Sequence, residues 1–96
     1  MTTKQRAYLR SLAMTMDPVA NIGKGSVTDE NIDAIKEALE ARELIKIAVL
    51  KNCLDDPKTV AQAVAEHTQA ELVQVIGRRF VLYKEAYDPK NRHIKI

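Results

Sequence analysis

The sequence contains few of the residue types on which metal sites and many enzymes depend. It has one cysteine, two histidines and no tryptophan among its 96 residues. The single cysteine, Cys53, excludes an internal disulfide and a cysteine-rich zinc site, because both need several thiols. The histidines, His67 and His93, belong to different segments, and neither has a second ligand at metal spacing. We therefore expect no metal, no cofactor and no catalytic centre.

Long apolar runs and nucleotide-binding motifs are also absent. No segment approaches the ~20 apolar residues that a membrane-spanning helix needs. The N-terminus, Met1-Thr2-Thr3-Lys4, reaches a charge at once and has no apolar signal stretch behind it. Neither the phosphate-binding loop nor the dinucleotide fingerprint occurs. These absences favour a small cytoplasmic protein that is not an enzyme and has no membrane or small-molecule substrate as a partner. We also expect a monomer.

The charged residues are unevenly distributed along a chain of one-domain length. Residues 1–27 carry four bases and one acid, residues 28–72 carry five bases and ten acids, and residues 73–96 carry six bases and two acids. If the basic ends meet in the fold, one face of the protein attracts polyanions such as nucleic acid. The alternative is that these charges only solvate the surface.

Hydrophobic periodicity predicts the order helix, strand, helix, strand, helix, strand, strand. The predicted helices are residues 3–16, 28–42 and 57–68, and the predicted strands are residues 19–22, 44–50, 72–76 and 80–83. Strands separated by helices imply parallel crossovers, and the short connection Gly77-Arg78-Arg79 implies an antiparallel hairpin. The predicted fold is α/β, with two layers: a four-stranded mixed sheet with three helices packed on it.

The first helix and the C-terminal segment are each predicted to have a distinct surface role. The apolar side of the helix consists of Tyr8, Leu9, Leu12 and Met16. Arg6 and Arg10 are four residues apart and share a different, exposed strip. The C-terminal segment is polar and lacks periodicity. We therefore assign residues 1–85 to one domain and residues 86–96 to a basic, flexible tail.

The segment Gly23-Lys24-Gly25-Ser26 lies between a predicted strand and a predicted helix. Glycines let a backbone approach another chain closely, Lys24 attracts phosphate, and the following helix presents free amides. Asp29 and Glu30 in the first helical turn repel a phosphate on the helix axis, so we expect contact with the loop itself. The alternative is a glycine turn that serves only the geometry of the connection.

Arg78 and Arg79 occupy the predicted hairpin tip, and Lys84 follows on the last strand. Arginine binds phosphate through two parallel hydrogen bonds, so this pair could clamp a nucleic-acid backbone. Alternatively, charges at an exposed turn prevent edge-to-edge aggregation. Aromatic residues are only 4% of the chain, and Phe80 and Tyr83 alternate onto opposite faces of one strand. Contact with backbone and shape is therefore favoured over stacking of bases on aromatic rings.

Four ordered segments resemble a known family. They are Lys4-Gln5-Arg6 with Leu9 and Leu12-Ala13; Pro18-Val19 leading to Ile22-Gly23-Lys24-Gly25; Glu43-Leu44-Ile45-Lys46-Ile47; and Glu71-Leu72-Val73-Gln74-Val75-Ile76-Gly77-Arg78 with Val81-Leu82-Tyr83-Lys84. Together they resemble the CRM domain, also called the YhbY-like RNA-binding domain, over about residues 2–85. The resemblance implies a fold similar to the C-terminal domain of translation initiation factor three.

The resemblance also implies a function and a site. Free-standing bacterial members associate with precursors of the large ribosomal subunit, and plant members act in organelle intron splicing. The family's Gly-x-x-Gly loop, likened to the loop of KH domains, falls on residues 23–26, where the fourth residue is Ser26 rather than glycine. The last strand of members often ends in Tyr-Arg, whereas this chain has Tyr83-Lys84, which keeps the charge and loses the two-pronged hydrogen bond.

We therefore predict a non-catalytic RNA-binding protein that acts in assembly of the large ribosomal subunit, with ribosomal RNA and the ribosomal particle as partners. The predicted RNA-binding residues are Gly23, Lys24, Gly25, Ser26, Arg78, Arg79, Lys84, Lys4, Arg6, Arg10 and Lys46. The alternative is a protein-interaction adaptor. Its acidic second helix, with Glu37 and Glu40, would dock a basic ribosomal protein.

Overall fold

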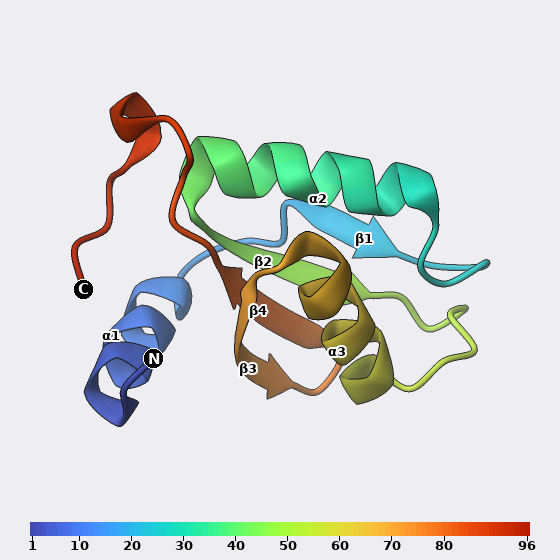
Figure 1. The fold of residues 1–96 in the computed structure, drawn as a ribbon. Coiled ribbons are helices and arrows are strands. Elements are labelled where there is room, and N and C mark those ends of the chain that lie inside the picture. The colour runs from blue at the N-terminus through green and yellow to red at the C-terminus, as the bar shows by residue number, and fades with distance from the viewer.

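The computed structural model describes residues 1–96 and contains each predicted helix and strand in the predicted order (Figure 1). The helices are α1 (Thr3–Ala13), α2 (Asp29–Arg42) and α3 (Pro57–Thr68), and the strands are β1 (Ala20–Ile22), β2 (Leu44–Val49), β3 (Glu71–Ile76) and β4 (Arg79–Tyr83). A short 3-10 helix, Pro89–Asn91, follows near the C-terminus. None of the helices combines the length and the apolar character that crossing a bilayer requires.

The four strands form one mixed sheet in the order β1-β2-β4-β3. β1 pairs with β2 in parallel, and β3 pairs with β4 in antiparallel, as predicted. β4 also pairs with β2 in antiparallel, a pairing that the sequence pattern did not predict. The β3–β4 pairing skips one residue, since Leu72 faces Leu82 and Gln74 faces Val81. Val73 is thus the extra residue of a β-bulge, which leaves nearby backbone groups without ladder partners.

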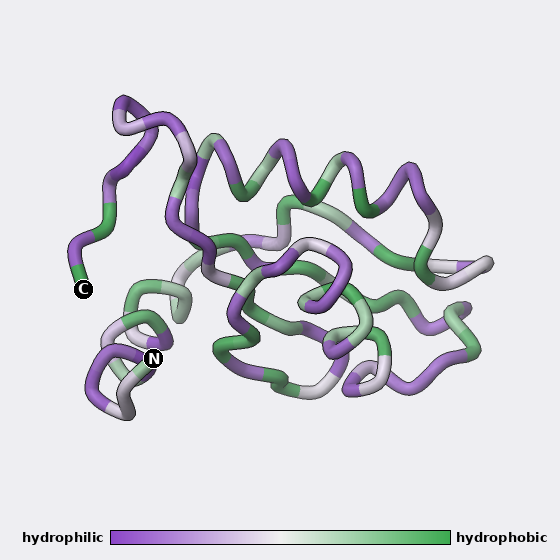
Figure 2. Tube along the Cα trace, in the orientation of Figure 1, coloured by the Kyte–Doolittle hydropathy of each residue, from purple (hydrophilic) through white to green (hydrophobic).

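The helices cover the two faces of the sheet unequally. α2 and α3 pack on the face that carries Ile45, Ile47, Phe80 and Leu82, and together they form the larger core cluster. In Figure 2 the outer side of α2 is mainly hydrophilic and the side facing the sheet is mainly hydrophobic. α1 packs on the opposite face over one end of the sheet, where Leu9 lies in a second cluster. The predicted fold has two layers, whereas in the structure α1 adds a partial third layer on the other face of the sheet.

The buried side of α1 differs from the predicted one. Leu9 and Ala13 are buried, whereas Tyr8 and Leu12 are 46% and 38% exposed. The helix also ends at Ala13 rather than at residue 16. Arg6, three residues before Leu9, completes the inward stripe at helical spacing. The prediction placed an arginine outside and a tyrosine inside, because hydropathy alone could not reveal the polar partner that Arg6 finds in β3.

The C-terminal segment is hydrogen-bonded to the end of α2. The buried carboxylate of Glu43 accepts the backbone N–H groups of Ala86, at 2.9 Å, and Ile94, at 3.1 Å. Ile94 also packs against the second core cluster. The predicted boundary after residue 85 thus falls at the start of a bonded segment. We propose that the folded unit extends to Ile94 instead of ending before a free tail.

Candidate nucleic-acid interface

Part of the α1-side sheet face is left uncovered. The strand register places Ile76, Arg79, Ala48 and Asn21 in one row across the four strands. Strands lie ~4.8 Å apart, so this row spans about 14 Å. α1 contacts the other end of the sheet through Leu44 and Tyr83. Side chains of this row therefore face solvent instead of a helix.

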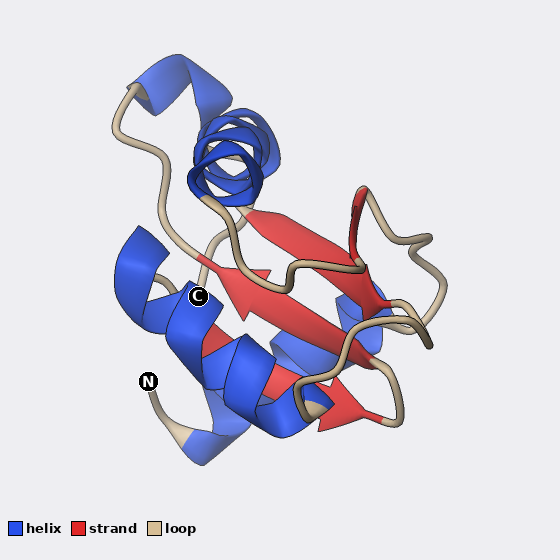
Figure 3. Cartoon of the chain, turned by 90° about the vertical axis from the view of Figure 1, so that its right-hand side faces the viewer, coloured by secondary structure: helices blue, strands red, loops and turns tan.

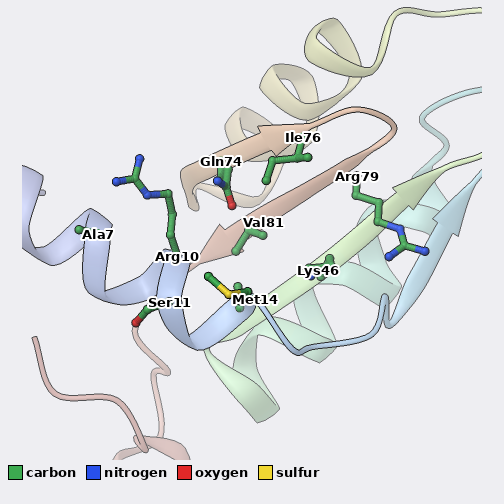
Figure 4. Close-up of a pocket in the computed structure, with 10 residues that line it drawn as sticks. Ala7, Arg10, Ser11, Met14, Lys46, Gln74, Ile76, Arg79 and Val81 are labelled. Carbon is green, nitrogen blue, oxygen red and sulfur yellow. The ribbon is translucent and has the colours of Figure 1, made fainter.

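A groove of about 410 Å³ lies between α1 and this open face. Its lining residues are Ala7, Arg10, Ser11, Ala13, Met14, Lys46, Gln74, Ile76, Arg79 and Val81, which include three cations and no acid. In Figure 4 Arg10 lies on the α1 side and Arg79 on the opposite side, with Met14 and Lys46 between them. Three predicted RNA-binding residues, Arg10, Lys46 and Arg79, thus line one groove. Such an arrangement attracts an anion with an apolar part.

The glycine turn, residues 23–26, follows β1 directly. It therefore lies close to Asn21, where the row of residues across the sheet ends. The turn is part of the β1–α2 loop, which faces the viewer together with the β2–α3 loop in Figure 3. Lys24 and Gly25 are exposed, so none of the helices covers the turn. Gly25 has a φ of 94° and Ser26 a φ of 55°, both in the region that favours glycine. Ser26 therefore adopts a glycine-like conformation.

Gly23 has a different constraint, which is contact with the neighbouring loop. A Cβ at this position would lie 3.0 Å from Asn52 Oδ1 and 3.3 Å from Leu50 Cδ1. The backbone N–H of Leu50 also donates to the carbonyl of Ile22 at 2.8 Å. The β1–α2 and β2–α3 loops are thus packed side by side at the end of the sheet that carries Lys24.

Arg78 uses much of its hydrogen-bonding capacity inside the protein. Its Nε donates to the carbonyl of Val49 at 2.9 Å, and its Nη2 donates to the carbonyl of Leu50. These bonds tie the hairpin turn to the end of β2 and use two of the five guanidinium N–H groups. Arg78 therefore has a structural role, whereas the exposed Arg79 makes no such bond and is free to meet a ligand.

Arg6 is also used internally, which corrects its predicted exposed position. Its Nη1 donates to the carbonyls of Leu72 and Val73, the latter at 3.2 Å. These carbonyls lie at the β3 bulge. A half-buried guanidinium that fixes a bulge is a structural element of the sheet, and Arg6 does not line the groove beside Arg10.

Two further predicted residues lie apart from the groove. Lys84 donates from Nζ to the carbonyl of Thr68 at 3.0 Å, at the C-terminal end of α3. It lines a hollow that it shares with Glu40, Glu66 and Glu85, which oppose a phosphate. Lys4 lines another hollow with Lys95 at the N-terminal end of α1. The predicted cations are therefore divided among separate surfaces, and one of these surfaces is the groove.

Comparison with known proteins identifies the family. The model of the CRS1/YhbY (CRM) domain matches residues 1–84. This chain belongs to the CRS1/YhbY (CRM) domain family. A Bacillus subtilis relative named "Probable RNA-binding protein YqeI" is 49% identical over 90 residues, which cover 94% of each chain. A Haemophilus influenzae relative named "RNA-binding protein" is 32% identical over 90 residues, which cover 94% of this chain and 91% of that one.

A solved structure agrees with this CRM domain in fold. The solution structure of a Staphylococcus aureus protein, described as a candidate RNA-binding protein, matches with a TM-score of 0.80 and 46% identity. The match covers 99% of each chain. The predicted fold class, an α/β fold with three helices and a four-stranded mixed sheet, is confirmed by this likeness and by the topology.

The acidic face of α2 in this CRM domain is partly occupied by the chain itself. The carboxylate of Glu40 accepts the N–H groups of Tyr87 at 2.7 Å and Asp88 at 3.0 Å. The N–H groups of Asp88 and then Tyr87 are the main reasons that the pKa of Glu40 is lowered. Glu37 remains exposed. Of the two glutamates predicted for an adaptor surface, one therefore already has partners.

Sequence reasoning missed the apolar and amide residues of the groove, Met14, Gln74 and Ile76. Strand alternation could have placed Ile76 on the face of Arg79, but the bulge at Val73 shifts the phase of β3. Met14 belongs to the predicted helical segment and in fact caps α1 just beyond its end. No group of three or more His, Cys, Asp or Glu side chains in the structure could hold a metal ion.

Proposed function

We propose that this CRM domain is a non-catalytic RNA-binding protein of the cytoplasm that associates with precursors of the large ribosomal subunit and acts in their assembly. The observation that supports this function is a groove lined by Arg10, Lys46 and Arg79 and by no acidic residue. Arg79 is in register with Ala48 and Asn21, and Asn21 lies just before the exposed glycine turn. The names of the B. subtilis and H. influenzae relatives point in the same direction.

The proposed binding mode uses backbone contacts on a preformed surface. Arg79 offers a planar guanidinium that can bind a phosphate through two hydrogen bonds, and Lys46 adds a point charge on the neighbouring strand. Lys24 and the loop amides can receive a further phosphate at the end of the sheet. Neutralising phosphates releases counterions, so affinity falls steeply as salt rises.

An adaptor function remains a second candidate, because Asp33 and Glu37 are exposed on the outer face of α2. Its surface is smaller than the sequence suggests, since Glu40 binds the C-terminal segment. The groove, by contrast, contains cations without acids. The charge distribution therefore favours RNA over a basic protein as the primary partner.

The RNA-binding proposal is tested by a salt titration with a large-subunit rRNA transcript. We expect Arg79→Gln and Lys46→Gln each to lower the slope of log K on log salt by about 0.9 for duplex or 0.7 for single-stranded contacts. Lys36→Gln removes the same charge from the exposed side of α2 and serves as the control. If Arg79→Gln and Lys46→Gln show the same slope of log K on log salt as Lys36→Gln, the groove is not part of the RNA interface.

The assembly proposal needs a separate test in cells. We expect crosslinking followed by sequencing to recover large-subunit rRNA, and sedimentation to place the protein with precursor particles. Arg79→Gln should reduce both signals. If Glu37→Lys abolishes association with particles while purified RNA still binds, the adaptor function is correct instead. Crosslinks confined to other RNAs would contradict the ribosomal part of the proposal.

A further inference from the structure

The groove contains more apolar surface than phosphate binding requires. Met14 is 77% exposed and Ile76 is 62% exposed, and both line the groove beside its cations. Val81 and Ala13 lie at its buried base. A site for phosphates alone needs only donors and positive charge. The exposed aliphatic side chains therefore fit a ligand that is apolar in part and anionic in part.

We propose that this groove binds an unpaired nucleobase of the RNA, with Arg10, Lys46 and Arg79 holding the adjoining phosphates. The proposal rests on the RNA-binding function proposed above and specifies its ligand as single-stranded. The groove volume of about 410 Å³ lies within the ~300–1,000 Å³ range of small-molecule sites. Unstacked bases are the parts of RNA that sheet surfaces and pockets bind.

The position of Gln74 adds a polar group on the groove wall. Its side-chain amide has donors and an acceptor, which suit the edge of a base. Met14 and Ile76 supply apolar contact to the flat face of the base, in a protein with too few aromatics for ring stacking. The thioether of methionine is polarisable and adapts to different ring shapes. This combination binds a base without demanding one sequence.

Charge complementarity favours this ligand over a peptide or a lipid. Two other hollows, on the side of α2 and α3, contain acids, namely Glu40, Glu66 and Glu85 in one and Asp29 and Asp33 in the other. The groove contains none, so a polyanion meets no repulsion there. A nucleotide supplies the base for the apolar part and the phosphate for the cations.

The test compares two strands of equal charge. One probe is a 12-mer of oligouridylate, and the other is a 12-mer of the same ribose-phosphate backbone without bases. Fluorescence anisotropy should show that the protein binds the base-containing strand about tenfold more tightly, because burial of a base against Met14 and Ile76 is a favourable contribution that the strand without bases lacks. Ile76→Ala and Met14→Ala should each reduce this ratio to about threefold or less, because each removes apolar contact with the base, with an unchanged salt slope.

Leu54→Ala is the matched control, because Leu54 is 98% exposed and lies outside the groove. All three truncated side chains are exposed, so each variant is expected to fold, which circular dichroism checks. The base site is contradicted if the protein binds the two strands with equal affinity, or if only the control variant loses the preference for the base-containing strand. Neither outcome contradicts the RNA-binding function. Binding of rRNA but of neither strand also overturns it. If rRNA does not bind either, the proposed function itself fails.

Discussion

The carboxylate of Glu43, at the end of α2, accepts the backbone N–H of Ala86 at 2.9 Å, across 43 residues of sequence. The same carboxylate accepts the N–H groups of His93 and Ile94. Glu43 is fully buried and has a φ of 67°, in the region that favours glycine. A buried charge and a strained backbone thus occur at one residue. The three N–H donors of the C-terminal segment compensate the charge.

Replacing Glu43 by glutamine should destabilise the fold. The amide group of glutamine would place a donor against one of the N–H donors, and the charge would be lost. We expect Glu43→Gln to lower the free energy of unfolding by about 2–3 kcal/mol, the cost of unsatisfied buried donors. Urea denaturation at neutral pH measures this effect. Glu37→Gln, on the exposed face of α2, should change stability by less than about 0.5 kcal/mol; similar losses in both variants would contradict the role of Glu43.

Stability should fall in acid because of the same contacts. Burial raises the pKa of Glu43, but the N–H groups of Ala86, His93 and Ile94 outweigh it, and the pKa is lowered from 4.5. The pKa of Glu40 is also lowered from 4.5, by the N–H groups of Asp88 and Tyr87. A lowered pKa in the fold gives stability that is present above the unfolded value and lost as pH falls through the folded value.

We therefore expect the free energy of unfolding to decrease as pH falls below about 4.5, the unfolded value. The double variant Glu40→Gln with Glu43→Gln should start lower at neutral pH and lose less on acidification, since neither position can then titrate. Denaturation at several pH values between neutral and strongly acidic measures the two slopes. Parallel slopes for the natural protein and the double variant would mean that other carboxyls control acid stability.

Local signals explain why most of the fold could be predicted. Thr28 and Asn31 form a capping box that begins α2, and Asp56 with Pro57 begins α3. Alternation in β2 places Ile45 and Ile47 on the core face and Lys46 on the other. These signals lie within a few residues of the element they define. They therefore predict element type and order from sequence alone.

The features that local sequence patterns could not indicate depend on distant partners. Arg6 binds the carbonyl of Leu72, which is 66 residues away, at a bulge that no local pattern indicates. Glu40 and Glu43 bind the C-terminal segment across more than 40 residues. Likewise, alternation places Lys46 away from the core, but only the position of α1 decides that this side forms a groove. Long-range packing decides which predicted cations are available to a ligand.

The two arginines of α1 should separate stability from binding. Arg6→Ala removes the guanidinium donor from the bulge carbonyls, so we expect a loss of about 1–3 kcal/mol in the free energy of unfolding. Arg10→Ala removes a groove cation without a bond inside the protein and should leave stability within about 0.5 kcal/mol. It should lower the salt slope of RNA binding by about 0.7–0.9. The reverse pattern, with Arg10 stabilising and Arg6 binding, would contradict the assignment of both residues.

The glycine turn provides a pair of substitutions with opposite expected signs. Ser26 has a φ of 55°, so Ser26→Gly should relieve backbone strain and raise the free energy of unfolding by about 1 kcal/mol. Gly25 has a φ of 94° and open space around it, so Gly25→Ala should cost a similar amount through backbone conformation alone. Denaturation measures both, and RNA affinity should be retained in Ser26→Gly because the loop keeps its shape. A fall in affinity in that variant would show that the Ser26 hydroxyl, rather than the conformation of the turn, contacts the ligand.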